Sequence, residues 1–364
     1  MVRVLQIVDS MDMGGIQTFI MNVYRHIDRT KIQFDFLIFR LYEQKFEKEI
    51  IHMGGKVYKI PGRKAGLLKN LMALKDFYRN HKEYKIVHYH TSSLSYLTPL
   101  VIAQKEGITK RILHSHNTKN SGSFVHRILH EIHKSQVKKI VTDYLACGEL
   151  AADWMYRGTG CREKAIVIAN GIDVRAYAYD EDKRLKIRKE FHVSEDCLVI
   201  GNVGRFADSK NHEFLISIFS ELSKRVSNTV LLLVGDGELR SQIEKKVEEE
   251  QLKNQVIFCG VRNDVDALLQ AMDIYIMPSL YEGFPVSAVE AQAAGLPCYI
   301  SDMVTKEVLI NPNVKQISLS RSPSEWADNI LISNNRYTDF SGLIRAGYDI
   351  SSTVEKLCKI YFEV

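Results

Sequence analysis

The sequence predicts an α/β protein with two domains, each built on a parallel β-sheet. Three observations support this fold class. Short β-rich runs alternate with helix-length segments along the 364 residues, the strand candidates are almost continuously apolar, and a pattern of strand, glycine turn and helix begins twice. Strands that are apolar along their whole length are typical of parallel sheets covered by helices on both faces. A chain of this length also suits two domains better than one.

The strands are predicted from the apolar runs in chain order. The first half offers RVLQIV, QFDFLIF, KIVHYHT, RILHSH and DYLAC, and the second half offers LVIGNVG, TVLLLVG, QVIFCG, DIYIMPS and PCYIS. The segments between them have helical periodicity, as in Phe214, Leu215, Ile218 and Leu222. The closing segment, SSTVEKLCKIYFEV, predicts a helix that begins with a capping box of Ser352 and Glu355.

The second start of the pattern places the domain boundary near Asn170. RVLQIVDSMDMGG opens the first domain and LVIGNVGRFADSKN opens the sheet of the second, with an irregular polar piece between them. We predict a first domain over 1–169, with 350–364 packed back on it, and a second over 170–349. Open α/β sheets bind ligands beyond the carboxyl ends of their strands. Two such domains facing each other across a cleft would place their ligand residues there.

Composition and charge exclude several classes of function. A net charge of +5 is mild for this length, and the chain has no aromatic-rich basic segment of the kind that binds nucleic acid. The six cysteines form no Cys-x-x-Cys pair, which argues against a zinc or dithiol site and fits a reducing cytoplasm. The first residues do not have the pattern of a signal peptide, and no run approaches the ~20 apolar residues of a membrane span.

Glycines and cations gather in the turns that follow the strands. Gly14 and Gly15 come after the first strand, where glycine lets the backbone approach a phosphate; a tight turn that needs positive φ is the alternative. Arg205 and Lys210 follow the first strand of the second domain and suit a pyrophosphate, with a pair of solvated cations as the alternative. A Gly-x-Gly-x-x-Gly fingerprint is missing after the first strand, which lowers the case for an NAD enzyme.

Two carboxylates, Glu282 and Glu290, bracket a Gly-Phe-Pro turn in SLYEGFPVSAVEAQAAGLP. Pro285 suits the first turn of the helix that follows, whose dipole favours an anion at its N-terminus. Glu282 can accept hydrogen bonds from sugar hydroxyls, and Glu290 from ribose hydroxyls. The structural alternative is that Glu282 complements the helix N-terminus while Glu290 lies on the surface. The backbone N–H groups expected to face a ligand are those of Gly283, Phe284 and Val286.

Four histidines, His88, His90, His114 and His116, recur at alternate positions of two predicted strands. A metal site is one interpretation, but no carboxylate or cysteine completes a ligand set. We therefore predict that His90 and His116 are functional, and that His88 and His114 are packed residues with satisfied hydrogen bonds. Two Asp-x-Asp sequences near predicted helix starts are interpreted as caps rather than metal ligands: Asp180 with Asp182, and Asp264 with Asp266.

Two predicted helices are basic and amphipathic. RKAGLLKNLMALKDFYRNHKEYK carries Leu67, Leu68, Leu71, Leu74 and Phe77 on one side among its cations, and SFVHRILHEIHKSQVKKIV is similarly basic. Packing of the apolar side on the core is the commoner explanation for such a pattern. The alternative is that the surface rests on anionic lipid, which gives the hypothesis of an anionic membrane surface as a partner.

The segment PSLYEGFPVSAVEAQAAGLP resembles the E-x7-E signature of the retaining glycosyltransferases of family 4, which have the GT-B fold of two Rossmann-like domains. Further matches in the family's order are GGIQ, HSHN, NGID, GRFADSKN, LLLVGDGELR and VIFCGVRNDV, and GYDISSTVEKLCKIY resembles the closing helix. The resemblance covers nearly the whole chain. RILHSHN together with GGIQ is most similar to bacterial exopolysaccharide and capsule enzymes. One departure is Gln17, where many members have Glu.

The resemblance implies a hexosyltransferase-type enzyme. The expected reaction is a retaining, metal-independent transfer of a sugar from a nucleotide-diphosphate donor, often UDP-linked, to a hydroxyl of a glycan or a lipid-linked oligosaccharide. His116 and Glu282 are the implied catalytic residues, and Gly14 and His90 lie on the acceptor side. The implied donor residues are Gly15, Arg205, Lys210, Val261, Arg262, Gly283, Phe284, Pro285 and Glu290.

No metal and no other cofactor is expected, because the nucleotide-sugar is itself a substrate. The expected location is the cytoplasm, with the inner face of the membrane as the place of peripheral binding, and nucleic acid is not expected as a partner. Two other functions stay open at this point. One is a nucleotide-sugar epimerase of the same two-domain build, and the other is a non-catalytic partner subunit of a glycosyltransferase pair.

Overall fold

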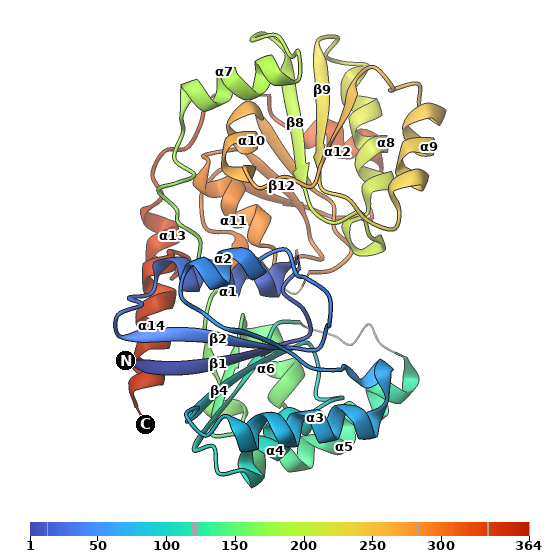
Figure 1. Ribbon diagram of the computed structural model, residues 1–364. Coiled ribbons are helices and arrows are strands. Elements are labelled where there is room, and N and C mark those ends of the chain that lie inside the picture. The colour runs from blue at the N-terminus through green and yellow to red at the C-terminus, as the bar shows by residue number, and fades with distance from the viewer. Residues whose placement is uncertain (13, 118–122, 283, 333–334, 364) are drawn as a thin grey trace. The chain divides into compact units, whose positions relative to one another are not determined.

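The computed structural model describes residues 1–12, 14–117, 123–282, 284–332 and 335–363. The chain divides into two compact α/β units (Figure 1). The N-terminal unit comprises Met1–Gly171 together with Ile350–Val364, and the C-terminal unit comprises Ile172–Asp349. The sequence had placed this division two residues earlier and had assigned 350–364 to the first domain.

The described part of the N-terminal unit has a seven-stranded, fully parallel sheet in the order β3-β2-β1-β4-β5-β6-β7. Its strand order reverses between β1 and β4, which is where open α/β sheets bind ligands. The strands are β1 Val2–Val8, β2 Ile32–Ile38, β3 Val57–Lys59, β4 Ile86–Thr91, β5 Lys110–Ser115, β6 Asp143–Ala146 and β7 Ile166–Val167.

Helices from both ends of the chain cover the sheet of this unit. The last helix packs beside the first and buries Leu357, Ile360 and Tyr361 in the core. The last helix begins at Ile350, so the expected capping box is wrong, because Ser352 lies inside the first turn. The helices are α1 Gly15–His26, α2 Glu47–His52, α3 Leu67–Asn80, α4 Thr98–Lys105, α5 Phe124–Ile140, α6 Glu149–Tyr156 and α14 Ile350–Phe362, with short 3-10 helices η1 Arg63–Ala65 and η2 Arg162–Lys164.

The C-terminal unit has, within its described residues, a six-stranded parallel sheet in the order β10-β9-β8-β11-β12-β13. Its strand order reverses between β8 and β11. The strands are β8 Leu198–Val203, β9 Thr229–Val234, β10 Val256–Gly260, β11 Ile274–Met277, β12 Cys298–Ser301 and β13 Val314–Ile317. The helices are α7 Glu181–Glu190, α8 His212–Ser223, α9 Arg240–Glu249, α10 Val265–Ala271, α11 Val286–Ala293, α12 Pro323–Asn329 and α13 Ser341–Arg345, with η3 Asp208–Lys210 and η4 Lys306–Val308.

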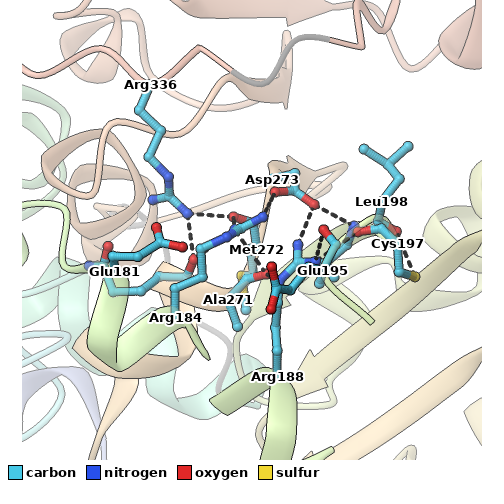
Figure 2. Close-up of polar contacts among 12 residues, drawn as sticks. Glu181, Arg184, Arg188, Glu195, Cys197, Leu198, Ala271, Met272, Asp273 and Arg336 are labelled. Atoms are coloured by element: carbon cyan, nitrogen blue, oxygen red, sulfur yellow. Dashed lines mark hydrogen bonds and ion pairs between the residues drawn. The ribbon is translucent and has the colours of Figure 1, made fainter. Parts of the chain in front are cut away.

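A cluster of arginines ties this unit together where β11 begins (Figure 2). Asp273 accepts hydrogen bonds from Arg184 and Arg188, each at 2.7 Å, and from the backbone N–H of Val199 at 2.7 Å. Arg336 donates to the carbonyl oxygens of Gln270 and Met272 that end α10, both at 2.6 Å. Cations at the C-terminus of a helix are stabilised by its dipole. The cluster lies at the amino end of β11, away from the turns that carry the expected ligand residues.

Candidate active site

The turns after β8, β9 and β10 are joined by backbone hydrogen bonds. Gly204 donates to Val234, and Gly235 donates to Gly260, both at 2.9 Å. Gly235 has a φ of +137°, and a Cβ added there would lie 2.0 Å from the carbonyl oxygen of Gly204. Only glycine fits this conformation and this close approach. The turns therefore hold one another in place along the carboxyl edge of the sheet.

Lys210 and Glu282 form an ion pair at the point where the strand order reverses. Lys210 ends η3 after β8, Glu282 follows β11, and the Nζ to Oε1 distance is 2.7 Å. Their side chains are only 16% and 10% exposed. The two loops are also joined by the backbone of Leu280, whose N–H donates to Ser209 at 2.8 Å. The sequence treated the two charges as separate ligand groups, although parallel neighbours β8 and β11 bring their following turns together.

Glu290 is a buried carboxyl group on α11. It is 9% exposed and accepts a 2.8 Å hydrogen bond from the hydroxyl of Tyr177. Burial raises the pKa of Glu290, and the hydrogen bond from Tyr177 opposes that rise. The surface alternative for Glu290 is therefore wrong. Tyr177 was missed by the sequence reasoning, because it lies in the irregular piece before α7 and no spacing links it to Glu290.

The start of α11 differs in two ways from the sequence prediction. The helix begins at Val286, so Pro285 is the residue before its first turn rather than part of it. The N–H of Val286 donates to the carbonyl oxygen of Phe284 at 3.1 Å, so it does not face a ligand. The ring of Phe284 stacks on Tyr348 with a centroid distance of 5.0 Å. Gly283 lies outside the described residues.

Arg205 and Arg262 form ion pairs with acids other than Glu282. The side chain of Arg205 is 74% exposed and pairs with Glu238 at 2.9 Å. Arg262 has a quarter of its side chain exposed, and the neighbouring Val261 is about half exposed. The carboxylates that bind the Arg262 guanidinium are Glu190 and Asp264. The structure thus brings Lys210 and Glu282 into contact but engages the two arginines elsewhere.

Three of the four Asp-x-Asp acids make contacts within the protein, and one of them caps a helix as expected. Asp180 accepts from the N–H of Lys183 at 3.0 Å and caps α7. Asp266 pairs with the Lys183 ammonium at 2.7 Å. Asp264 precedes α10 without a capping hydrogen bond, because its carboxylate is taken by Arg262. Asp182 lies in the first turn of α7.

The glycine pair of the N-terminal unit opens α1. Gly14 has an extended φ of 172°, so the tight-turn explanation that needs positive φ is wrong for it. A Cβ on Gly14 would lie 2.5 Å from the side-chain oxygen of Gln17, so that side chain would have to shift. Gln17 in turn donates to the carbonyl oxygen of Ser10 at 2.9 Å. A Cβ on Gly15 would meet no described atom within 4 Å, so the space beside it is open.

The four histidines form one contiguous cluster with Gln6. The Nδ1 of His90 lies 2.9 Å from the Nε2 of His116, and its Nε2 lies 2.8 Å from the side-chain amide oxygen of Gln6. The second pair, His88 and His114, is joined at 3.1 Å. The Nδ1 of His88 lies 2.7 Å from the hydroxyl of Tyr361 on α14. The chain's last helix therefore completes a polar network that begins on β1.

The bond to Gln6 determines where the protons lie. A carbonyl oxygen only accepts, so His90 carries its proton on Nε2 and its Nδ1 accepts from the Nε2–H of His116. Burial lowers the pKa of all four histidines, and that of His116 to about 3, so the rings are neutral at pH 7. The Nδ1 of neutral His116 is then an acceptor.

A metal site is the competing interpretation of this cluster. Nitrogens of His88, His90 and His114 lie within 4.8 Å of one another, without an acid or cysteine in the group. Most of these nitrogens are already engaged in hydrogen bonds within the network. The Nε2 of His114 has no partner among the described residues, so the expectation of a satisfied ring is wrong for His114. Hydrogen bonds within the network engage both ring nitrogens of His88 and of His90.

Comparison with known proteins assigns the family. The Glycosyltransferase Family 4 model matches residues 13–176, and the Glycosyl transferases group 1 model matches residues 183–332. The putative glycosyltransferase EpsF of Bacillus subtilis (strain 168) is 32% identical over 369 residues, covering 99% of this chain and 96% of EpsF. The chain belongs to glycosyltransferase family 4. It is accordingly a hexosyltransferase-type enzyme.

Two further proteins are similar to this glycosyltransferase over nearly its whole length. The capsular polysaccharide biosynthesis glycosyltransferase CapH of Staphylococcus aureus is 24% identical, and the match covers 99% of each chain. HepE of Anabaena, solved as a crystal structure in complex with UDP and glucose, superposes with a TM-score of 0.83 at 17% identity, covering 100% of both chains. The glycosyltransferase therefore has the GT-B fold, with two Rossmann-like domains.

Proposed function

We propose that this enzyme transfers a sugar from a UDP-linked donor, with retention of configuration, to a hydroxyl of a glycan or lipid-linked oligosaccharide in exopolysaccharide or capsule assembly. The observation that carries the proposal is the Lys210–Glu282 ion pair beside the buried Glu290 at the strand-order reversal of the C-terminal sheet. The complex of HepE with UDP and glucose supports the donor, and the likeness to CapH supports the polysaccharide product.

Each of these residues has a chemical part in the proposal. The Lys210 ammonium, held at 2.7 Å from Glu282, stabilises the diphosphate as it leaves. Glu282 accepts hydrogen bonds from the hydroxyls of the transferred sugar, and Glu290 accepts them from the ribose. His116, neutral and with Nδ1 as an acceptor, orients a hydroxyl near the reaction centre. Attack from the face of the leaving phosphate needs no side-chain nucleophile.

Metal independence is part of the same proposal. Lys210 supplies the positive charge that a divalent cation would otherwise supply to a leaving diphosphate. Of the Asp-x-Asp acids, Asp266 pairs with Lys183 and Asp264 with Arg262. Turnover is accordingly expected to persist in the presence of a chelator.

A panel of nucleotide sugars tests the donor. A ligand at a hundred times its Kd stabilises the folded state by about 2.7 kcal/mol, so the specific donor should raise the melting temperature above the other members of the panel. The donor identified in this way is then incubated with saccharide acceptors, with and without a chelator, and the anomeric configuration of the product is read by NMR. Stabilisation by a UDP-sugar together with a retained-configuration product is the expected result.

The same assay separates the two competing functions. A nucleotide-sugar epimerase would convert the donor into its isomer without an acceptor. A non-catalytic partner subunit would be stabilised by a donor but would not turn it over. An inverted product, or turnover abolished by the chelator, would contradict the mechanism proposed here while leaving the family assignment intact.

We also propose that the N-terminal unit binds the surface of an anionic membrane. Leu67 and Leu68 are 71% and 75% exposed, so core packing does not explain them. On α5, Phe124 and Val125 are 69% and 60% exposed. Both helices also carry several lysines and arginines. None of the described helices combines the length and the apolar character that crossing a membrane requires.

A further inference from the structure

A cavity of about 610 Å³ opens at the carboxyl ends of β1, β2 and β4 in the N-terminal unit. Its walls come from the end of β1 and the residue after it, from the first turn of α1, from 39–42 after β2, from η1 with the two residues before it, and from the end of β4 with residues of the loop that follows. This is the strand-order reversal of the sheet, and the volume lies within the roughly 300–1,000 Å³ typical of small-molecule sites. The cavity has room for a saccharide.

The charged residues that line the cavity are mostly cations. Arg40, Arg63 and Lys64 face a single carboxylate, Asp9. Arg40 uses one of its terminal nitrogens on Asp9 at 2.6 Å. Arg63 and Lys64 are then left without a counter-charge in the lining. A pocket with this excess of positive charge favours an anionic ligand.

Arg63 is held in place without a carboxylate partner. Its guanidinium lies over the ring of Tyr96, 4.4 Å from the centroid, and it has no ion pair among the described residues. A Cβ on Gly62 would lie 2.8 Å from the carbonyl oxygen of Phe39, so this segment packs tightly on the end of β2. Asn70 also donates to Pro61 at 2.7 Å. The cation is therefore positioned by the fold before any ligand arrives.

Arg40 provides an independent sign of a missing acceptor. Its Nε is buried and has no hydrogen-bond partner in the described part of the chain. A buried donor left without a partner costs about 1–3 kcal/mol, so such groups are usually satisfied by a ligand or water. Arg40 therefore has hydrogen-bonding capacity that its contact with Asp9 leaves unused.

The remaining walls suit a sugar. The ring of Tyr42 offers an apolar surface, and the segment after β4 contributes the hydroxyls of Ser92 and Ser93. The cavity is also lined by His90, whose Nδ1 contacts His116 at 2.9 Å. The cavity thus connects an anion site with the histidine pair of the candidate reaction centre.

We propose that this cavity binds the acceptor, and that the acceptor is a saccharide bearing a negative charge, as a phosphate ester or a carboxylate. The anion lies against Arg63 and Arg40, and the sugar lies against the ring of Tyr42 and the hydroxyls of Ser92 and Ser93. That the bound sugar is an acceptor, with its reactive hydroxyl near His116, rests on the proposed function. The anion selectivity of the cavity rests on the geometry alone.

Binding of three monosaccharide probes tests the proposal. Glucose 1-phosphate, glucuronic acid and glucose are titrated by ligand-observed NMR against the full chain, Arg63→Gln and Arg79→Gln. Arg79 is the matched control, because it is an exposed arginine on α3 outside the cavity. Arg63→Gln should weaken binding of the preferred anionic probe by about tenfold or more, since it removes charge-assisted hydrogen bonds. Glucose binding should change by less than about twofold, and Arg79→Gln should match the unaltered chain.

The two anionic probes distinguish a phosphate-bearing acceptor from an acidic sugar, and a preference for either over glucose supports the proposal. Equal binding of charged and neutral probes overturns it, as does equal loss in Arg63→Gln and Arg79→Gln, or no binding of either anion. UDP stabilisation is measured on the same samples. If UDP binds and the anions do not, only the cavity inference fails. If the anions bind and no nucleotide sugar does, the proposed donor chemistry fails instead.

Discussion

Lys210 lies close to two carboxyl groups in different surroundings. Glu282 forms an ion pair with it at 2.7 Å, whereas Glu290 is buried and bonded to Tyr177. The lysine also lowers the pKa of Glu290, against the larger effect of burial. The Lys210 ammonium can therefore neutralise a diphosphate in a site that is mostly shielded from water. A charge has a greater effect there than in bulk water.

Replacing Lys210 separates catalysis from folding. Lys210→Ala should lower kcat by about a hundredfold or more, the cost of removing one transition-state donor. The same change removes the ion pair between Lys210 and Glu282, whose side chain is only 10% exposed, so some loss of stability is expected. A Lys210→Ala, Glu282→Gln double variant removes both charges of the pair and should regain stability but not turnover.

The exposed Lys245 on α9, changed to alanine, is the control for a lost cation. Turnover is measured with the donor found in the panel, and stability by denaturant unfolding. Full turnover by a normally folded Lys210→Ala chain would remove the lysine from the phosphate role.

The central strands of both sheets were predicted from the sequence to within one or two residues. These strands are buried on both faces, as in β2 and β9. Because both faces are buried, nearly every residue of such a strand is apolar, and the run can be recognised in the sequence. The strands missed are the edge strands β3 and β13. β3 has only three residues and β13 is VKQI, with an exposed lysine. Such short, half-polar segments have no periodicity to detect.

The site was predictable only where neighbouring residues in the chain carry it. Glu282 and Glu290 share one segment, so their proximity to α11 was evident. The contact of Tyr177 with Glu290 spans 113 positions, and that of His88 with Tyr361 spans 273. These pairs depend on how α14 and the segment before α7 return to the sheets. Tertiary packing, which no local pattern encodes, decides them.

At the level of elements, α3 and α5 give a test of membrane binding. The full chain should sediment with vesicles containing anionic lipid at low salt, and less so at high salt, because the attraction is screened. A Leu67→Ser, Leu68→Ser variant should reduce the bound fraction, since two apolar side chains no longer enter the interface; the partition coefficient should fall by at least about tenfold.

Ile51→Ser, at a residue that is 57% exposed on α2, controls for the loss of an exposed apolar side chain elsewhere. Neutral phosphatidylcholine vesicles control for the lipid charge. Absence of sedimentation with anionic vesicles at low salt would rule out the membrane proposal. Equal loss in the Ile51 variant would show that α3 is not the contact surface.

Over the whole molecule, both sheets place their candidate residues at the same topological position. The strand order reverses at β1 and β4 in one unit and at β8 and β11 in the other. In the N-terminal unit this point carries the cavity and the histidine cluster, and in the C-terminal unit it carries the Lys210–Glu282 pair. One rule of α/β architecture therefore locates both candidate sites, although their chemistry differs.

The histidine network makes the stability of the protein depend on pH. Burial holds the folded-state pKa of its four histidines below the ordinary value, with that of His116 at about 3. Below about pH 6.5 the unfolded chain therefore binds more protons than the folded chain, and the free energy of unfolding falls by about 1.4 kcal/mol per pH unit for each histidine. Above that pH the contribution is complete. Burial raises the pKa of Glu290, so the folded chain can bind at most one proton more than the unfolded chain at this group, and this partly opposes the fall.

A comparison of variants isolates the contribution of the network between pH 5 and 8. His114→Phe keeps an aromatic ring in the stack while removing one titrating group and a buried nitrogen without a partner. Its free energy of unfolding is measured by denaturant at each pH. Below pH 6.5 this free energy should fall less steeply with decreasing pH than in the unaltered chain, by about 1.4 kcal/mol per pH unit, because one fewer proton is bound on unfolding. His52→Gln, at an exposed position of α2, should keep the full slope. Identical slopes in all three chains would mean that the buried rings accept protons in the folded state, and that His116 is not held neutral as an acceptor.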